Sequence, residues 1–208
     1  MTKPADGTKR VVIEGVDPEI DAGRYPIKRV VGDIVQVQAD VFADGHDRIS
    51  CSLLYRHEED SGPQSIVMEP LGNDRWQASF QVTKPGCYFY TIVGSVDHFG
   101  TWRSDLMKRL EAGQDVSLEL QTGGLLVEAA VRRATGDDAS RLKEWAKMLL
   151  TESEDEDCKV VALDTALAAL MTQYTDAAQE SRYPKDLTVS VDRERARFSS
   201  RDGVDLPP

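Results

Sequence analysis

Hydrophobic and polar residues alternate through the first half of the chain. The clearest run lies between Asp33 and Phe42, where every second residue is apolar: Val35, Val37, Ala39 and Val41. A period of two residues places these side chains on one face of a half-buried strand. About six or seven such runs, spaced roughly ten residues apart and separated by turn sequences, are typical of an antiparallel β-sandwich.

The apolar period becomes helical from residue 101 onward. We expect a short helix over 103–112 and a second one within 115–134, where the adjacent Gly123 and Gly124 weaken the helical pattern. Gly136 is expected to terminate this second helix as its C-cap.

A further helix is expected to begin at Asp138, because its apolar residues recur at helical spacing. They are Leu142, Trp145, Ala146, Leu149 and Leu150. Ser153 and Glu156 form a capping-box pattern that predicts one more helix. Its apolar set is Val160, Leu163, Leu167, Leu170, Met171 and Tyr174. Pro184 should end the helical region.

Strand-like alternation returns in the tail, where Leu187, Val189 and Val191 alternate with polar residues. The helical segment therefore interrupts the sandwich, and the overall class is α+β. We expect a sandwich over 9–100, a helical insert over 101–184, a final strand returning to the sandwich over 185–200, and a disordered tail over 201–208.

The charge of the chain argues against nucleic acid and anionic membranes as partners. Its formal net charge is −11, and its lysines and arginines are scattered along the sequence. The first seven residues contain no apolar run, so we expect no signal peptide and a cytoplasmic protein. No apolar stretch approaches the ~20 residues of a membrane-spanning helix.

Residues that could support catalysis or metal binding are few. The three cysteines, Cys51, Cys87 and Cys158, are widely spaced, which favours reduced structural thiols over a redox or metal site. The acids of 152–157 and the turn at 44–47 could hold a cation, but we favour a solvated helix start for the acids and a plain hairpin turn for 44–47. We therefore expect no metal, no cofactor and no catalytic residues in this chain.

Aromatic residues crowd into the strand-forming half, and they suggest a carbohydrate-binding surface. Exposed rings at the edge of a sandwich can stack on sugar rings. Trp102, Trp76 and Tyr88 are the candidates for stacking on an α-glucan. Packing in the core is the favoured interpretation for most of the aromatic residues, since Trp76 and Phe80 share one face of a predicted strand, whereas Trp102 could equally well be exposed or at an interface because it lies where the sandwich ends.

Several long runs resemble one enzyme family, the bacterial maltosyltransferases that use maltose 1-phosphate to extend α-1,4-glucan. The runs are Val11–Glu14, Gly23–Pro26, Lys28–Gly32, Ala39–Asp47, Glu69–Trp76, Thr101–Arg103, Ala112–Val116 and Val191–Ser199. They occur in the family's order across about residues 9–199.

The resemblance implies an immunoglobulin-like sandwich with a helical insert, followed by a catalytic (β/α)₈ barrel of the α-amylase-like superfamily. In that family the sandwich and its insert contribute to a homodimer interface, and the catalytic carboxylates lie on the barrel. A barrel requires at least ~200 further residues, so we expect catalysis to lie outside these 208 residues. The chain is then a scaffold and dimerisation module, or alternatively a carbohydrate-binding module.

Overall fold

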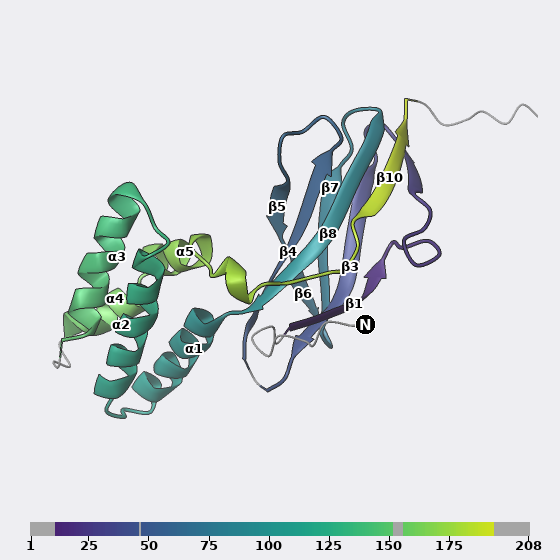
Figure 1. Ribbon diagram of the computed structural model, residues 1–208. Helices are drawn as coiled ribbons and strands as arrows, with labels where there is room; N and C mark the ends of the chain where they lie inside the picture. Colours follow the sequence, from purple (N-terminus) through teal and green to yellow (C-terminus); the bar gives the residue numbers. More distant parts are fainter. Residues whose placement is uncertain (1–10, 46, 152–155, 194–208) are drawn as a thin grey trace, which may run out of the picture. The chain divides into compact units, whose positions relative to one another are not determined.

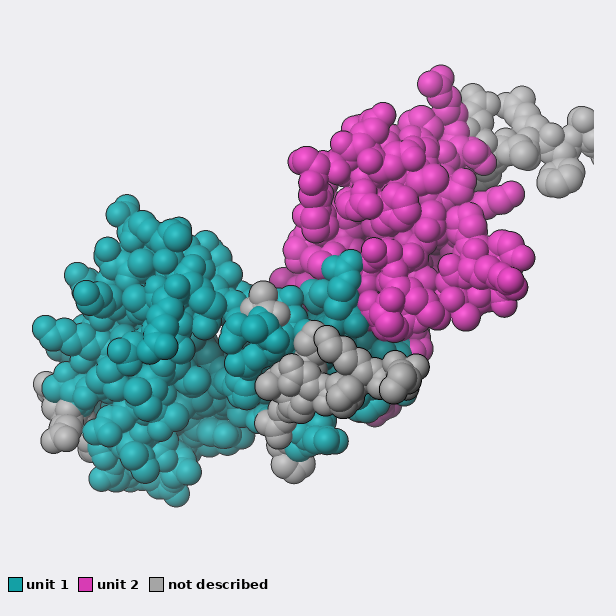
Figure 2. All heavy atoms as spheres, viewed as in Figure 1, with its two compact units in different colours: residues 1–14, 40–51, 93–182 teal, residues 15–39, 52–92, 183–208 magenta. Residues whose placement is uncertain are grey.

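The protein is described from a computed structural model, which places residues 11–45, 47–151 and 156–193 (Figure 1). Two compact units compose the chain (Figure 2). The helical unit comprises residues 1–14, 40–51 and 93–182, and the β unit comprises residues 15–39, 52–92 and 183–208. Each unit is described by itself.

The described strands form two sheets. The four-stranded sheet has the order β1 (Val11–Asp17), β3 (Ile34–Ala43), β7 (Arg75–Gln81), β6 (Glu69–Gly72). The six-stranded sheet has the order β2 (Ile27–Val30), β10 (Leu187–Asp192), β8 (Gly86–Val96), β4 (Ile49–His57), β5 (Gln64–Val67), and β9 (Ser181–Arg182) also pairs with β8.

Aromatic residues join the two sheets into a sandwich. Phe80 on β7 stacks on Tyr55 of β4, with ring centroids 4.5 Å apart, and it lies 6.2 and 6.0 Å from Tyr88 and Tyr90 of β8. The alternation predicted for β3 is confirmed, because its four inward residues are fully buried: Val35, Val37, Ala39 and Val41. The predicted sandwich with a helical insert is therefore correct.

The six-stranded sheet is mixed, which corrects the expectation of a purely antiparallel sandwich. The final strand β10 pairs antiparallel with β8, but it pairs parallel with β2, with Val189 opposite Ile27. Parallel neighbours need a long crossover connection, and the chain between residues 30 and 187 provides it. Alternation within a strand does not report the direction of its neighbour, so the sequence pattern could not show this pairing.

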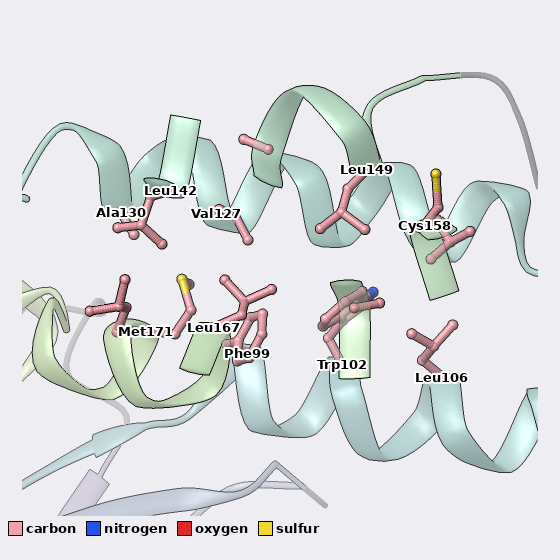
Figure 3. Close-up of a cluster of buried hydrophobic side chains, with 14 of the residues drawn as sticks. Phe99, Trp102, Leu106, Val127, Ala130, Leu142, Leu149, Cys158, Leu167 and Met171 are labelled. Atoms are coloured by element: carbon pink, nitrogen blue, oxygen red, sulfur yellow. The ribbon is translucent and has the colours of Figure 1, made fainter. Parts of the chain in front are cut away.

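Five helices lie between β8 and β10 in the described sequence. They are α1 (His98–Glu111), α2 (Ser117–Val131), α3 (Gly136–Leu149), α4 (Glu156–Leu163) and α5 (Thr165–Gln173). A single-turn helix η1 (Ala177–Gln179) follows. Figure 3 shows how side chains from these helices meet in one apolar core, to which Phe99, Trp102 and Leu106 of α1 contribute.

Three helix boundaries differ from the predictions. Helix α1 begins five residues earlier, at His98, because Asp97 caps it: Asp97 Oδ1 accepts a hydrogen bond of 2.7 Å from the Gly100 N–H. Gly136 has a φ of +60° but opens α3 instead of ending α2, and Thr135, not Asp138, is the N-cap of α3.

The last predicted helix is two helices. Asp164 accepts a hydrogen bond of 2.7 Å from the Ala166 N–H and caps α5, which separates it from α4. The predicted apolar stripe therefore does not run along one helix, and Val160 on α4 is 63% exposed. The predicted capping box at 153–156 lies largely outside the described residues. The proposed domain limits at 100 and 184, and the disordered tail, stay predictions.

Candidate functional site

Trp102 lies in the core of the helical unit and is only 8% exposed. Its indole Nε1 donates a hydrogen bond of 2.7 Å to the carbonyl of Glu119 on α2, and its ring packs 5.1 Å from that of Phe99. A buried indole whose N–H has a partner is typical of core packing. In this conformation the ring offers no open face to a sugar.

Two glycines of α2 make room for this packing. A Cβ at Gly123 would lie 2.0 Å from the Trp102 ring, and a Cβ at Gly124 would lie 2.7 Å from Leu150. Both glycines are buried inside a continuous helix. The pair that weakened the sequence prediction is therefore required by close helix packing.

Tyr88 is also buried, at 4% exposure, and it holds a turn of the β unit. Its hydroxyl accepts hydrogen bonds of 3.0 Å from the backbone N–H groups of both Thr83 and Lys84. Its ring meets that of His57 edge-on at 4.8 Å. The side chain thus fixes the connection between β7 and β8, and it has no ring face available for stacking.

Trp76 differs from the other two aromatic residues because it is partly exposed. It lies on β7, opposite Pro70 of the edge strand β6. The structure thus places the three candidate residues in three separate packing environments. Stacking of α-glucan stays a prediction for Trp76, whereas burial of Trp102 and Tyr88 argues against direct sugar contact there.

The cysteines and acids show no assembled reactive centre in the described part of the chain. None of the three cysteines is in a disulfide: Cys51 and Cys158 are buried and Cys87 is half-buried, and burial raises the pKa of Cys51 to about 12. Across residues 11–45, 47–151 and 156–193, no three His, Cys, Asp or Glu side chains are close enough to hold a metal ion. No helix among these residues has the length and apolarity needed to cross a membrane.

One charged cluster of the β unit was missed by sequence reasoning. Glu19 accepts hydrogen bonds of 2.6 Å from both Lys185 Nζ and the Tyr183 hydroxyl, and the Tyr90 hydroxyl donates to the carbonyl of Pro18. Burial alone raises the pKa of Glu19, but the two hydrogen bonds and the Lys185 charge outweigh it and lower that pKa. Glu19 lies more than 150 positions from Tyr183 and Lys185 in the sequence, so no local pattern could pair them.

The outward face of α2 is an apolar surface that lies in solvent. Leu118 and Leu125 are seven residues apart, on one side of the helix, and they are 68% and 59% exposed. Thr122 and Ala129 continue this face. We call these four residues the α2 outer face. Glu119 and Glu128 are the only charged residues in the 15-residue helix.

The fold and these packing sites define an α+β domain, a β-sandwich interrupted by a helical insert. Residues 9–193 match a protein family described as "Alpha-1,4-glucan:maltose-1-phosphate maltosyltransferase, domain N/S". The chain belongs to this family, the N/S domain of the α-1,4-glucan:maltose-1-phosphate maltosyltransferases.

Curated relatives agree with this assignment. The Chlorobaculum tepidum α-1,4-glucan:maltose-1-phosphate maltosyltransferase is 44% identical over 200 residues, which cover 96% of this chain and 30% of the relative. The enzymes of the same name from Myxococcus xanthus and Methylacidiphilum infernorum are 43% and 38% identical, over 93% and 95% of this chain and 32% and 29% of their own lengths. The chain thus spans about a third of these relatives and corresponds to their N-terminal region.

Proposed function

We propose that this chain is the non-catalytic scaffold and dimerisation module of a cytoplasmic maltosyltransferase that transfers maltose from maltose 1-phosphate to α-1,4-glucan. The names and lengths of the relatives support the parent activity, because each relative has a further two-thirds of polypeptide in which catalysis can reside. The buried aromatic residues support a packing role for this part.

The α2 outer face carries the dimerisation proposal. Helix α2 buries one side in the helical core through Leu120, Val127 and Ala130, yet it places Leu118 and Leu125 in solvent on the other side. A helix with apolar residues on both sides is normally covered on both sides. Large exposed apolar side chains grouped on one element mark interaction surfaces.

A second copy of the chain is the occupant that the charge of the protein favours. Helix α2 carries few charged residues, although the whole chain has a formal net charge of −11. Two copies can therefore meet at the α2 outer face without bringing many negative charges close together. Symmetric contact through one patch is the commonest form of homodimer. The helix face then becomes the insert's share of the interface, and the sandwich contributes the rest.

Two variants measured by sedimentation velocity test this proposal. We expect Leu118→Ser combined with Leu125→Ser to convert dimers into monomers at concentrations where the unmodified chain is dimeric. Val160→Ser is the matched control, because Val160 is 63% exposed on α4 and lies off this face. Loss of the dimer in the control as well, or its retention in the double variant, would contradict the role of α2.

A further inference from the structure

A hollow in the helical unit lies where the start of α1, the second half of α2 and the end of α5 meet. Its volume is about 160 Å³, and every residue that lines it belongs to this unit. Cavities of about 150 Å³ in proteins are large enough for one six-membered ring such as benzene. The hollow is therefore of the size of a single ring, and too small for a longer ligand to enter whole.

One part of the lining is apolar and another part carries hydroxyl groups. Phe99, Leu126 and Met171 supply the apolar part. Ser95 and Thr175 also line the hollow, and their hydroxyls have no hydrogen-bond partner within the described residues.

The hydroxyl of Ser95 is available to a ligand. The residue as a whole is 8% exposed on β8. Among the described residues, the buried polar side-chain atoms without a partner are Arg103 Nε and Ser181 Oγ, so the Ser95 hydroxyl still meets solvent. A ligand that brings its own donors and acceptors into the hollow would replace that water.

The charged groups of the lining are already engaged by the protein. Asp97 caps α1 through Gly100, and Arg133 donates to the backbone carbonyls of Tyr174 and Ala129 at 2.8 and 3.0 Å. Asp176 accepts hydrogen bonds of 3.1 Å from the Ala178 N–H and from the Gln179 side chain. With two carboxylates and one guanidinium beside it, the hollow has no excess positive charge for a phosphate.

We propose that this hollow binds one pyranose ring, a neutral six-membered ring that carries hydroxyl groups. The apolar side chains would lie against the C–H face of the ring, as in ligand sites that combine an apolar wall with a few polar groups. Ser95, Thr172 and Thr175 would hydrogen-bond its hydroxyls. The ring is either a free monosaccharide or the terminal unit of a glucan chain. This proposal does not rest on dimerisation through the α2 outer face, with which the hollow shares Ala129, or on the stacking predicted for Trp76.

The test is an NMR titration of the ¹⁵N-labelled full chain with four probes. Methyl α-D-glucopyranoside is a single closed ring, maltose represents a chain end, sorbitol has the hydroxyls without the ring, and glucose 6-phosphate adds charge. We expect the amides of Ser95, Val96, Thr172 and Thr175 to shift together with the glucoside, with a Kd of about 1–10 mM for so small a ligand. Equal affinity for the glucoside and maltose supports recognition of any pyranose, and tighter binding of maltose supports a glucan chain end.

Matched variants separate this site from other sugar contacts. Ser95→Leu should fill the hollow and abolish the shifts. Thr172→Val should weaken binding about three- to tenfold, the range for one hydrogen bond. Thr151→Val is the control, because both threonines donate to the carbonyl four residues earlier at 3.0 Å, and Thr151 is outside the lining and off the α2 outer face.

Four results would overturn the proposal. The first is that none of these amides shifts with any neutral pyranose up to about 50 mM, a concentration well above the expected Kd. The second is that sorbitol gives equal shifts. The third is that the Thr172→Val and Ser95→Leu variants bind as well as the unmodified chain. Shifts confined to the amides around Trp76 would also overturn it, and they would assign sugar binding to the sandwich edge.

Discussion

The indole of Trp102 lies directly against the backbone of Gly123. A Cβ at position 123 would come within 2.0 Å of the ring, and the indole N–H donates to Glu119, one helical turn earlier on α2. The position of α1 against α2 therefore depends on a glycine and a tryptophan together. This pair explains why a glycine persists in the interior of α2 despite its low helix propensity.

We expect Gly123→Ala to destabilise the chain, although alanine favours helix by about 1 kcal/mol. The added methyl group must displace buried ring atoms, and overpacking of this kind costs about 1–3 kcal/mol. Chemical denaturation should show a lower free energy of unfolding. The double variant with Trp102→Phe should recover part of the loss, because the smaller ring leaves space, and a strictly additive double variant would contradict direct contact.

Replacement of Tyr88 by phenylalanine tests the role of its hydroxyl in the turn. The hydroxyl accepts two backbone hydrogen bonds, so Tyr88→Phe should lower the free energy of unfolding by about 1–2 kcal/mol. Tyr25→Phe is the control, because Tyr25 is 57% exposed. It should change stability by less than about 0.5 kcal/mol. Equal effects of the two substitutions would contradict this role of Tyr88.

The Glu19 cluster predicts a specific dependence of stability on pH. The pKa of Glu19 in the folded protein is below its ordinary value of 4.5, so its carboxylate stabilises the fold above that value and this contribution is lost as pH falls through the lowered pKa. Glu19→Gln should be less stable than the unmodified chain by about 1 kcal/mol at pH 7. The difference should shrink below pH 4.5.

Denaturation curves at several pH values measure this difference. Glu128→Gln, at an exposed carboxylate of α2, is the control and should follow the unmodified chain at every pH. A Glu19→Gln difference that stays constant from neutral to acidic pH would exclude the carboxylate charge as its source.

Local patterns in the sequence were sufficient to predict the strands, but they were not sufficient to predict which helix residues contact one another. The alternation of Val35, Val37 and Ala39 depends on one strand facing one core, and the structure reproduces it. The role of Trp102 depends on where α1 begins, and the Asp97 cap moves that start to include Phe99 and bury both rings. Contacts made across long stretches of sequence, such as Trp102 with Gly123, leave no periodic signal.

The proposed binding sites also differ in how far the sequence alone could predict them. Crowding of aromatic residues suggested sugar stacking, but aromatic residues also form most cores, and two of the three candidates are buried. The hollow beside Ser95 could not be predicted, because its lining comes from two strands, three helices and the segment after α5. The exposure of Leu118 and Leu125 on the α2 outer face is likewise seen only in the structure.

The molar mass of the unmodified chain in solution tests the dimerisation account most directly. Light scattering during size-exclusion chromatography should give twice the chain mass of 23.1 kDa at high concentration, with a shift toward the single mass on dilution. A mass of 23.1 kDa at every concentration that can be reached would contradict the account.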